Sequence, residues 1–237
     1  MTATRGEDLG SSVDVPDTKA TKEAILAGIR AALADVPPLP PERDVPVRWG
    51  YGSTASGIVS DAVTGLFAER CGDYGAAVVR VAQPDAAAEA GRLLADHGAA
   101  RVAVPAGLDQ AVAEALKEAG VEVRGDDPPL TAAELDALDG VVTACRVAIA
   151  ETGTLVLDHA ADQGRRALTL VPDLHLCLVR ADQIAPDVPQ AVARLRPSVL
   201  EGRPLTWVSG PSATVDIELT RVEGVHGPRT LLVVIGE

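Results

Sequence analysis

The feature that most constrains the fold is an alternation of short apolar runs and helical periodicity between residues 76 and 124. Residues 76–82, 101–105 and 121–124 are apolar runs of strand length, and residues 84–97 and 109–119 between them have the apolar spacing of helices. Successive parallel strands need a crossover of this length, and such crossovers are almost always right-handed. The alternation therefore predicts an α/β domain in which helices cover a parallel sheet.

The last ninety residues are organised differently, because short apolar strands there meet polar turns that contain glycine. Residues 140–144 predict one further strand, and four apolar segments follow: AIAETGTLVLD, LTLVPDLHLCLVR, LTWVSGPSATVDIEL and GVHGPRTLLVVIG. Ligand sites on α/β sheets lie where loops leave the carboxyl ends of strands. We therefore expect these turns to carry the chemistry and to lie at that edge of the sheet.

The N-terminal part of the chain differs from this domain in composition. Residues 1–17 have almost no large apolar side chains, which predicts a disordered tail. Residues 18–50 predict an N-terminal helix with an apolar stripe, followed by an extended arm that has five prolines between residues 36 and 46. We place the main domain at residues 51–237.

Charge and composition exclude several classes of function. The chain has 34 acidic and 21 basic residues, a net charge of −13, and only five aromatic residues. An acidic protein with few aromatic side chains is a poor partner for nucleic acid or for an anionic membrane surface. No apolar run approaches the roughly 20 residues that span a bilayer.

The cysteines indicate that this chain binds no cofactor by itself. Cys71, Cys145 and Cys177 lie far apart, without the close pairs typical of iron-sulphur or zinc sites, and no GxGxxG, flavin or haem signature is present. An odd number of thiols behind a polar N-terminus predicts a reducing, cytoplasmic location.

The first candidate site is the turn Glu151-Thr152-Gly153. A carboxylate beside a glycine, which lets a ligand approach the backbone, is a candidate acid, base or nucleophile. The alternative is a turn glutamate on a solvated edge.

A second candidate is the turn Gly210-Pro211-Ser212, which follows a predicted strand. Its backbone N–H groups and hydroxyl suit a carboxylate or phosphate, although the same residues also form ordinary turns. Asp216 and Glu218 come next and share one side of an extended segment. They could share a proton, bind a cation, or solvate the edge of a sheet.

Histidine and arginine provide the remaining candidates. His226 lies between two glycines and is a candidate proton shuttle, with a structural histidine as the alternative. Arg165 and Arg166 suit a small carboxylic acid, with a solvated turn as the alternative. His175 alternates with leucines in an apparent strand, and we assign it no catalytic role.

In order and spacing, the four C-terminal segments resemble the LUD-domain family, in its lactate utilisation protein C branch, over about residues 140–235. The resemblance implies a fold similar to ribose-phosphate isomerases, glucosamine-phosphate deaminases and CoA transferases. This is a Rossmann-like parallel or mixed sheet flanked by helices. It also implies a role in oxidising L-lactate to pyruvate with two iron-sulphur proteins, whose clusters this chain lacks.

The family pattern carries over to particular residues. With the arginine pair added, our catalytic candidates are Glu151, His226, Asp216 and Glu218. Our candidates for substrate binding are Thr152, Gly153, Arg165, Arg166, Gly210, Ser212, Thr214 and Gly227.

Three hypotheses of function follow. In the first, the chain is the cluster-free subunit or accessory protein of a lactate-oxidising complex and is no oxidoreductase alone; it could bind a small carboxylic acid. In the second, it is a non-catalytic scaffold of that complex. In the third, it is a stand-alone isomerase or acyl-transfer enzyme that uses Glu151.

Overall fold

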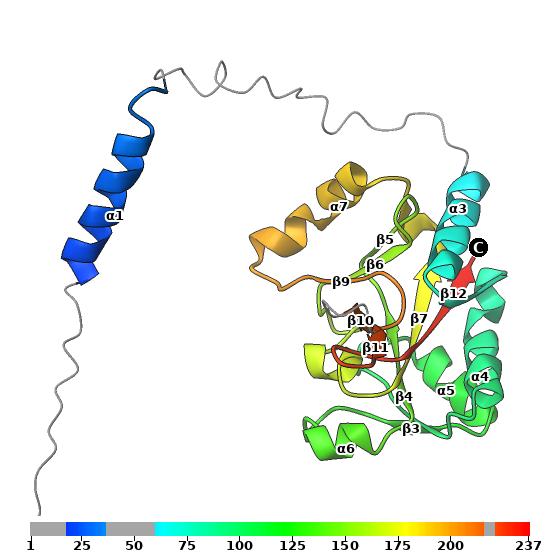
Figure 1. Ribbon diagram of the computed structural model, residues 1–237. Coiled ribbons are helices and arrows are strands. Elements are labelled where there is room, and N and C mark those ends of the chain that lie inside the picture. Colours follow the sequence, from blue (N-terminus) through cyan, green and yellow to red (C-terminus); the bar gives the residue numbers. More distant parts are fainter. Residues whose placement is uncertain (1–17, 37–59, 216–220) are drawn as a thin grey trace, which may run out of the picture. The chain divides into compact units, whose positions relative to one another are not determined.

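The computed structural model describes residues 18–36, 60–215 and 221–237 (Figure 1). The chain divides into two units, Met1–Trp49 and Gly50–Glu237. The expected tail over residues 1–17 and the proline-rich arm lie outside the described residues. Among the residues described here, no helix is long and apolar enough to cross a membrane.

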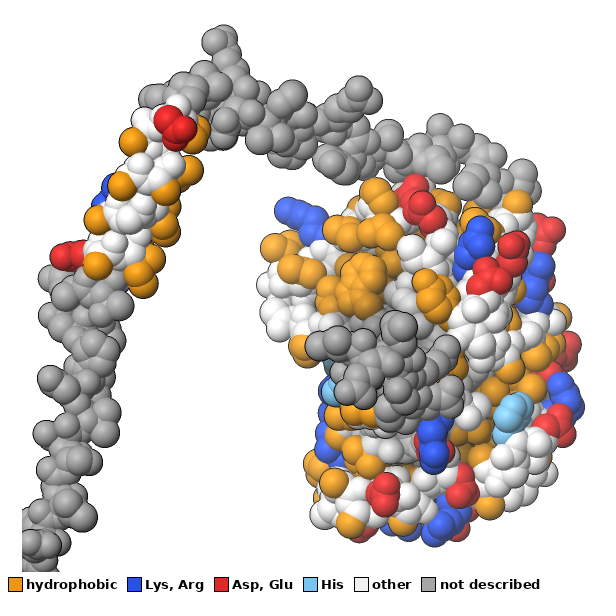
Figure 2. Space-filling model, viewed as in Figure 1, with side chains coloured by type: hydrophobic (Ala, Val, Ile, Leu, Met, Phe, Trp, Pro, Cys, Tyr) orange, Lys and Arg blue, Asp and Glu red, His pale blue; other side chains and the backbone are white. Residues whose placement is uncertain are grey.

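The first unit contains helix α1 (Thr18–Ala32). Its apolar stripe follows the predicted spacing, and all four large side chains of that stripe are exposed: Ile25, Leu26, Ile29 and Leu33. Figure 2 shows hydrophobic side chains along this helix.

The second unit is built on a six-stranded sheet in which every strand is parallel to its neighbours, in the order β1-β12-β7-β4-β2-β3. This confirms the predicted parallel sheet. Its strands are β1 (Ala77–Val81), β2 (Arg101–Ala103), β3 (Glu122–Arg124), β4 (Gly140–Ala144), β7 (Leu174–Arg180) and β12 (Thr230–Gly236).

A smaller mixed sheet inserts between β4 and β7 and continues after β7. Its order is β8-β5-β6-β9, with one parallel and two antiparallel pairs. The strands are β5 (Val147–Ile149), β6 (Thr154–Leu157), β8 (Ile184–Ala185) and β9 (Thr206–Val208). A separate antiparallel pair, β10 (Ala213–Val215) and β11 (Arg221–Glu223), precedes β12.

Helices and the small sheet cover the two faces of the central sheet (Figure 1). Helices α4 (Ala86–Asp96) and α5 (Gln110–Glu118) pack on one face. Helix α3 (Ser60–Asp73) and the small sheet pack on the other face. Three 3-10 turns, η1 (Gln83–Asp85), η2 (Arg166–Thr169) and η3 (Ala181–Gln183), join these elements.

Two further helices have clear start signals. Thr131 caps α6 (Ala132–Asp136) through a reciprocal capping box with Glu134. Helix α7 (Val188–Leu200) was missed in the sequence, although Asp187 caps it by accepting the Gln190 N–H at 2.9 Å and a proline occupies its first turn.

The alternation of side chains along β7 decides which residues face the small sheet. Leu174 and Leu176 pack against α4 and α5, whereas Cys177 and Val179 pack against α3 and the small sheet. Since side chains alternate along a strand, His175 points to the same side as Cys177.

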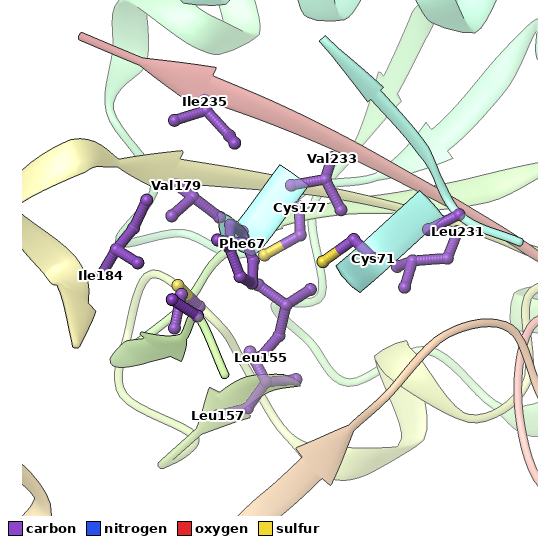
Figure 3. Close-up of a cluster of buried hydrophobic side chains, with 14 of the residues drawn as sticks. Phe67, Cys71, Leu155, Leu157, Cys177, Val179, Ile184, Leu231, Val233 and Ile235 are labelled. Atoms are coloured by element: carbon purple, nitrogen blue, oxygen red, sulfur yellow. The ribbon is translucent and has the colours of Figure 1, made fainter. Parts of the chain in front are cut away.

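The three cysteines meet in this core although they are distant in sequence. All three are free and buried in one hydrophobic cluster, in which Figure 3 labels Cys71 and Cys177. Burial raises the pKa of Cys71 to about 12, and the hydrogen bond with Cys145 together with burial raises the pKa of Cys177. At neutral pH the thiols of Cys71 and Cys177 are therefore protonated side chains of the core.

We predict that Phe67→Ala destabilises the domain by about 3–5 kcal/mol, because it leaves a cavity between α3 and both sheets. Phe67 is fully buried and is the one phenylalanine of the chain. Urea unfolding followed by circular dichroism measures the change. The exposed substitution Val192→Ala on α7 should change the free energy of unfolding by less than about 0.5 kcal/mol. Equal effects of the two substitutions would contradict this assignment of the core.

Candidate functional site

A pocket of about 220 Å³ brings together residues from distant parts of the chain. Its walls come from η2, the start of β7, the segment from β9 to β10, and the turn before β12. Five of the predicted binding or catalytic residues line it: Arg166, Gly210, Ser212, His226 and Gly227.

Backbone hydrogen bonds join the two glycine-bearing turns that form this pocket. The Ser212 N–H donates to the Pro228 carbonyl at 2.8 Å, and the Gly224 N–H donates to the Ser212 carbonyl at 3.0 Å. The Ser212 hydroxyl accepts the His226 N–H at 3.2 Å. These hydrogen bonds of Ser212 therefore hold the turn that contains His226 in place.

Arg166 provides the positive charge of the pocket. Its guanidinium donates to the carbonyl and hydroxyl of Thr169 at 2.8 and 3.1 Å, and to the His226 carbonyl at 3.3 Å. Partial burial lowers the pKa of Arg166. Within the described part of the chain, no carboxylate lies at ion-pair distance from this guanidinium. A partly desolvated cation with neutral partners favours an anion as ligand.

His175 lines the same pocket, although the sequence analysis assigned it no role. Its side chain is only 2% exposed, and Nε2 shares a hydrogen bond with the Thr143 hydroxyl of β4 at 2.8 Å. Burial, together with the positive charge of Arg166, lowers the pKa of His175 to about 4. The ring is therefore neutral at pH 7. A polar residue on the inward face of an otherwise apolar strand was the signal that could have identified it.

Arg165 contacts another part of the molecule. It makes a two-pronged ion pair with Asp126, with nitrogen-oxygen distances of 2.7 and 2.9 Å, and donates to the Leu130 carbonyl. The Arg165 guanidinium lowers the pKa of Asp126. This pair ties η2 to the loop before α6, and Arg165 is not among the residues that line the pocket.

The Glu151 turn joins β5 to β6 and lies next to the pocket wall. Glu151 is exposed, and the pocket lining does not include it. The Thr152 hydroxyl contacts the Thr154 hydroxyl at 2.8 Å, and Thr154 in turn contacts the hydroxyl of Ser209, which lines the pocket, at 2.8 Å.

Two of the candidate glycines have close neighbours within the protein. Gly153 has a φ of 57°, and a Cβ there would lie 2.7 Å from the carbonyl carbon of Arg70 in α3. Gly210 has a φ of 80°, and a Cβ there would lie 2.6 Å from that of Tyr74. Both positions need glycine for packing. Their binding roles stay predictions.

The remaining candidates lie in or beside the β10–β11 pair. Thr214 is in β10, paired with Val222 of β11. Asp216 and Glu218 lie outside the described residues. Among the described residues, no group of three or more His, Cys, Asp or Glu side chains could hold a metal ion.

The pocket lies at the amino ends of β7 and β12, so the expectation of the carboxyl edge was wrong for this site. His175 is the second residue of β7, and the His226 turn leads into β12. The chain returns from the small sheet to the beginning of β12, which places the turn there.

A larger cavity of about 690 Å³ occupies the carboxyl edge. Three of its polar side chains already make contacts within the protein. Gln183 donates to the Cys145 carbonyl at 2.7 Å, Asp109 caps α5, and Arg180 pairs with Asp182.

Comparison with known proteins assigns this arrangement to a family. The LUD domain model matches residues 65–235. The chain belongs to the LUD domain family. A LUD relative from Deinococcus radiodurans, named "Lactate utilization protein C", is 46% identical over 223 residues, covering 93% of this chain and 98% of the relative. A Bacillus subtilis protein of the same name is 34% identical over 91 residues, covering 37% of this chain and 38% of that protein.

A solved structure supports the LUD fold. The crystal structure of a DUF162 family protein from Deinococcus radiodurans is 42% identical and has a TM-score of 0.65. The match covers 76% of this chain and all of that one.

We predict that His175 makes the domain less stable as the pH falls from about 6.5 to about 4. In this window the unfolded chain binds a proton at this histidine and the folded LUD domain does not, so acid favours unfolding, by about 3 kcal/mol in total. His175→Gln should remove that part of the pH dependence in urea unfolding. The matched substitution His97→Gln, at the exposed end of α4, should leave it unchanged. An equal loss of pH dependence in both variants would contradict the prediction.

Proposed function

We propose that this chain is the cluster-free subunit of a cytoplasmic iron-sulphur system that oxidises L-lactate to pyruvate. The observation that carries the proposal is the pocket around Arg166, to which three of the four LUD-like segments contribute residues. Its size suits a small carboxylic acid, and its cation, which has no ion-pair partner among the described residues, suits a carboxylate. Relatives named for lactate utilisation support the choice of acid.

The chemistry of the reaction supports a division of labour between subunits. Oxidation of a 2-hydroxy acid to a 2-oxo acid releases two electrons and two protons, and an acceptor must take the electrons. All three thiols of this chain are buried in the core, and burial raises the pKa of Cys71 and Cys177, so they are poor ligands for a cluster. Two iron-sulphur partner proteins would supply the acceptor. Three free thiols also suit a reducing cytoplasm.

A non-catalytic scaffold is the second candidate, and exposed apolar side chains favour it. Val192, Val199 and Leu200 of α7 and Trp207 of β9 are all exposed. Figure 2 shows hydrophobic side chains gathered over the region of α7. Exposed apolar patches commonly mark surfaces that bind other proteins. The stand-alone enzyme is less favoured, because Glu151 is outside the pocket lining.

Reconstitution tests the proposal. Anaerobic, L-lactate-dependent dye reduction by the purified iron-sulphur partners should appear only when this chain is added in stoichiometric amount. Full rate without the chain would overturn the proposal.

We predict that Arg166→Gln lowers the reconstituted rate by about 10- to 100-fold, because it removes a charge-assisted hydrogen bond to the carboxylate. Arg92→Gln is the matched control, since Arg92 is exposed on α4 across the central sheet and pairs with Glu89. It should retain the full rate. Full rate with Arg166→Gln would favour the scaffold.

A further inference from the structure

One ring nitrogen of His175 has no hydrogen-bond partner among the described residues. Nε2 bonds to Thr143, and within the described residues Nδ1 has no hydrogen bond. Among the described residues, every side-chain nitrogen or oxygen atom that is fully buried has a hydrogen-bond partner. Nδ1 must therefore reach the cavity that His175 lines. A side chain this deeply buried with a free polar atom at a cavity indicates that a ligand supplies the missing hydrogen bond.

Arg166 and His175 reach this pocket from consecutive elements of the chain. Arg166 is in η2, just before β7, and His175 is in β7 itself. Arg166 is the one permanently charged side chain among the described lining residues. A single positive charge and a neutral ring in about 220 Å³ match a small molecule with one carboxylate and one further polar group.

We propose that this pocket binds small monocarboxylates that carry an oxygen on C2. Arg166 holds the carboxylate, and Nδ1 of His175 bonds the C2 oxygen. The site is that of the proposed function, on which the physiological identity of the ligand rests. The inference adds the group that selects the ligand, and it requires no electron transfer.

Because of the Thr143 hydroxyl, the same ring can form a hydrogen bond with either a hydroxyl or a carbonyl group of the ligand. A hydroxyl can donate or accept, so it supports either neutral tautomer of His175. With the proton on Nε2, Nδ1 accepts a hydrogen bond from a 2-hydroxyl group. With the proton on Nδ1, it donates to a 2-oxo group. A 2-hydroxy acid and its 2-oxo product therefore fit without a change of charge in the pocket.

Ligand binding to the isolated full-length chain tests the proposal. Calorimetric titrations with L-lactate, pyruvate and propionate compare two acids that have a C2 oxygen with one that lacks it. L-lactate and pyruvate should bind about tenfold more tightly than propionate, the value of one hydrogen bond. Succinate, with a second carboxylate, should bind more weakly than L-lactate.

Two variants separate the two contacts. Arg166→Gln should weaken the binding of all the acids by tenfold or more. His175→Phe should lower the affinity for L-lactate and pyruvate to that for propionate. The affinity for propionate should stay unchanged. Arg92→Gln is the control for a lost arginine and should bind as the unaltered chain does.

A measurement on the unaltered chain keeps the test independent of how His175→Phe folds. In nitrogen-15 spectra of the histidine rings, the chemical shift of Nδ1 of His175 should change when L-lactate or pyruvate is added. It should stay the same when propionate is added. Equal affinity for the three acids, or an unmoved Nδ1 signal, would overturn the inference. Selective binding together with full dye reduction in the absence of the chain would overturn the proposed function alone.

Discussion

Burial of both faces of the central sheet is the constraint on which the rest of the structure depends. From Leu231 to Ile235, each side chain of β12 is at most 3% exposed, so both of its faces need a cover. Helices α4 and α5 cover one face. Helix α3 and the small mixed sheet together cover the other face. The pocket forms where the small sheet meets the first residues of β7 and β12.

A polar residue in such a strand is costly unless it finds partners. His175 satisfies one ring nitrogen through Thr143 on the neighbouring strand and presents the other to the pocket. Arg166 is held by the oxygen atoms of Thr169 and by the carbonyl of His226, all of them neutral. The site therefore combines a ring that burial keeps neutral with a cation that has no carboxylate beside it in the described part of the chain. These are conditions that favour a small organic anion.

The segments that resemble the family stabilise the fold, and they also form the candidate site. Gly153 and Gly210 have positive φ angles and leave room for Arg70 and Tyr74, so packing alone explains these two glycines. Ser212 ties two turns together through its backbone and its hydroxyl. In this chain these segments thus determine the shape of the pocket wall, in addition to supplying the candidate ligand-binding groups.

Local patterns determined much of this protein from sequence alone. The alternation of residues 76–124 predicted the parallel sheet, because hydrophobic periodicity acts within a few residues. The Asp187-Val188-Pro189 signal of α7 was also local, but it was overlooked. Only the tertiary structure decided that Arg166, His175 and the His226 turn share one pocket at the amino ends of the strands, that Arg165 faces away to Asp126, and that the three cysteines meet. Such contacts join residues far apart in the chain, and the packing of one sheet on another decides them, which no local pattern encodes.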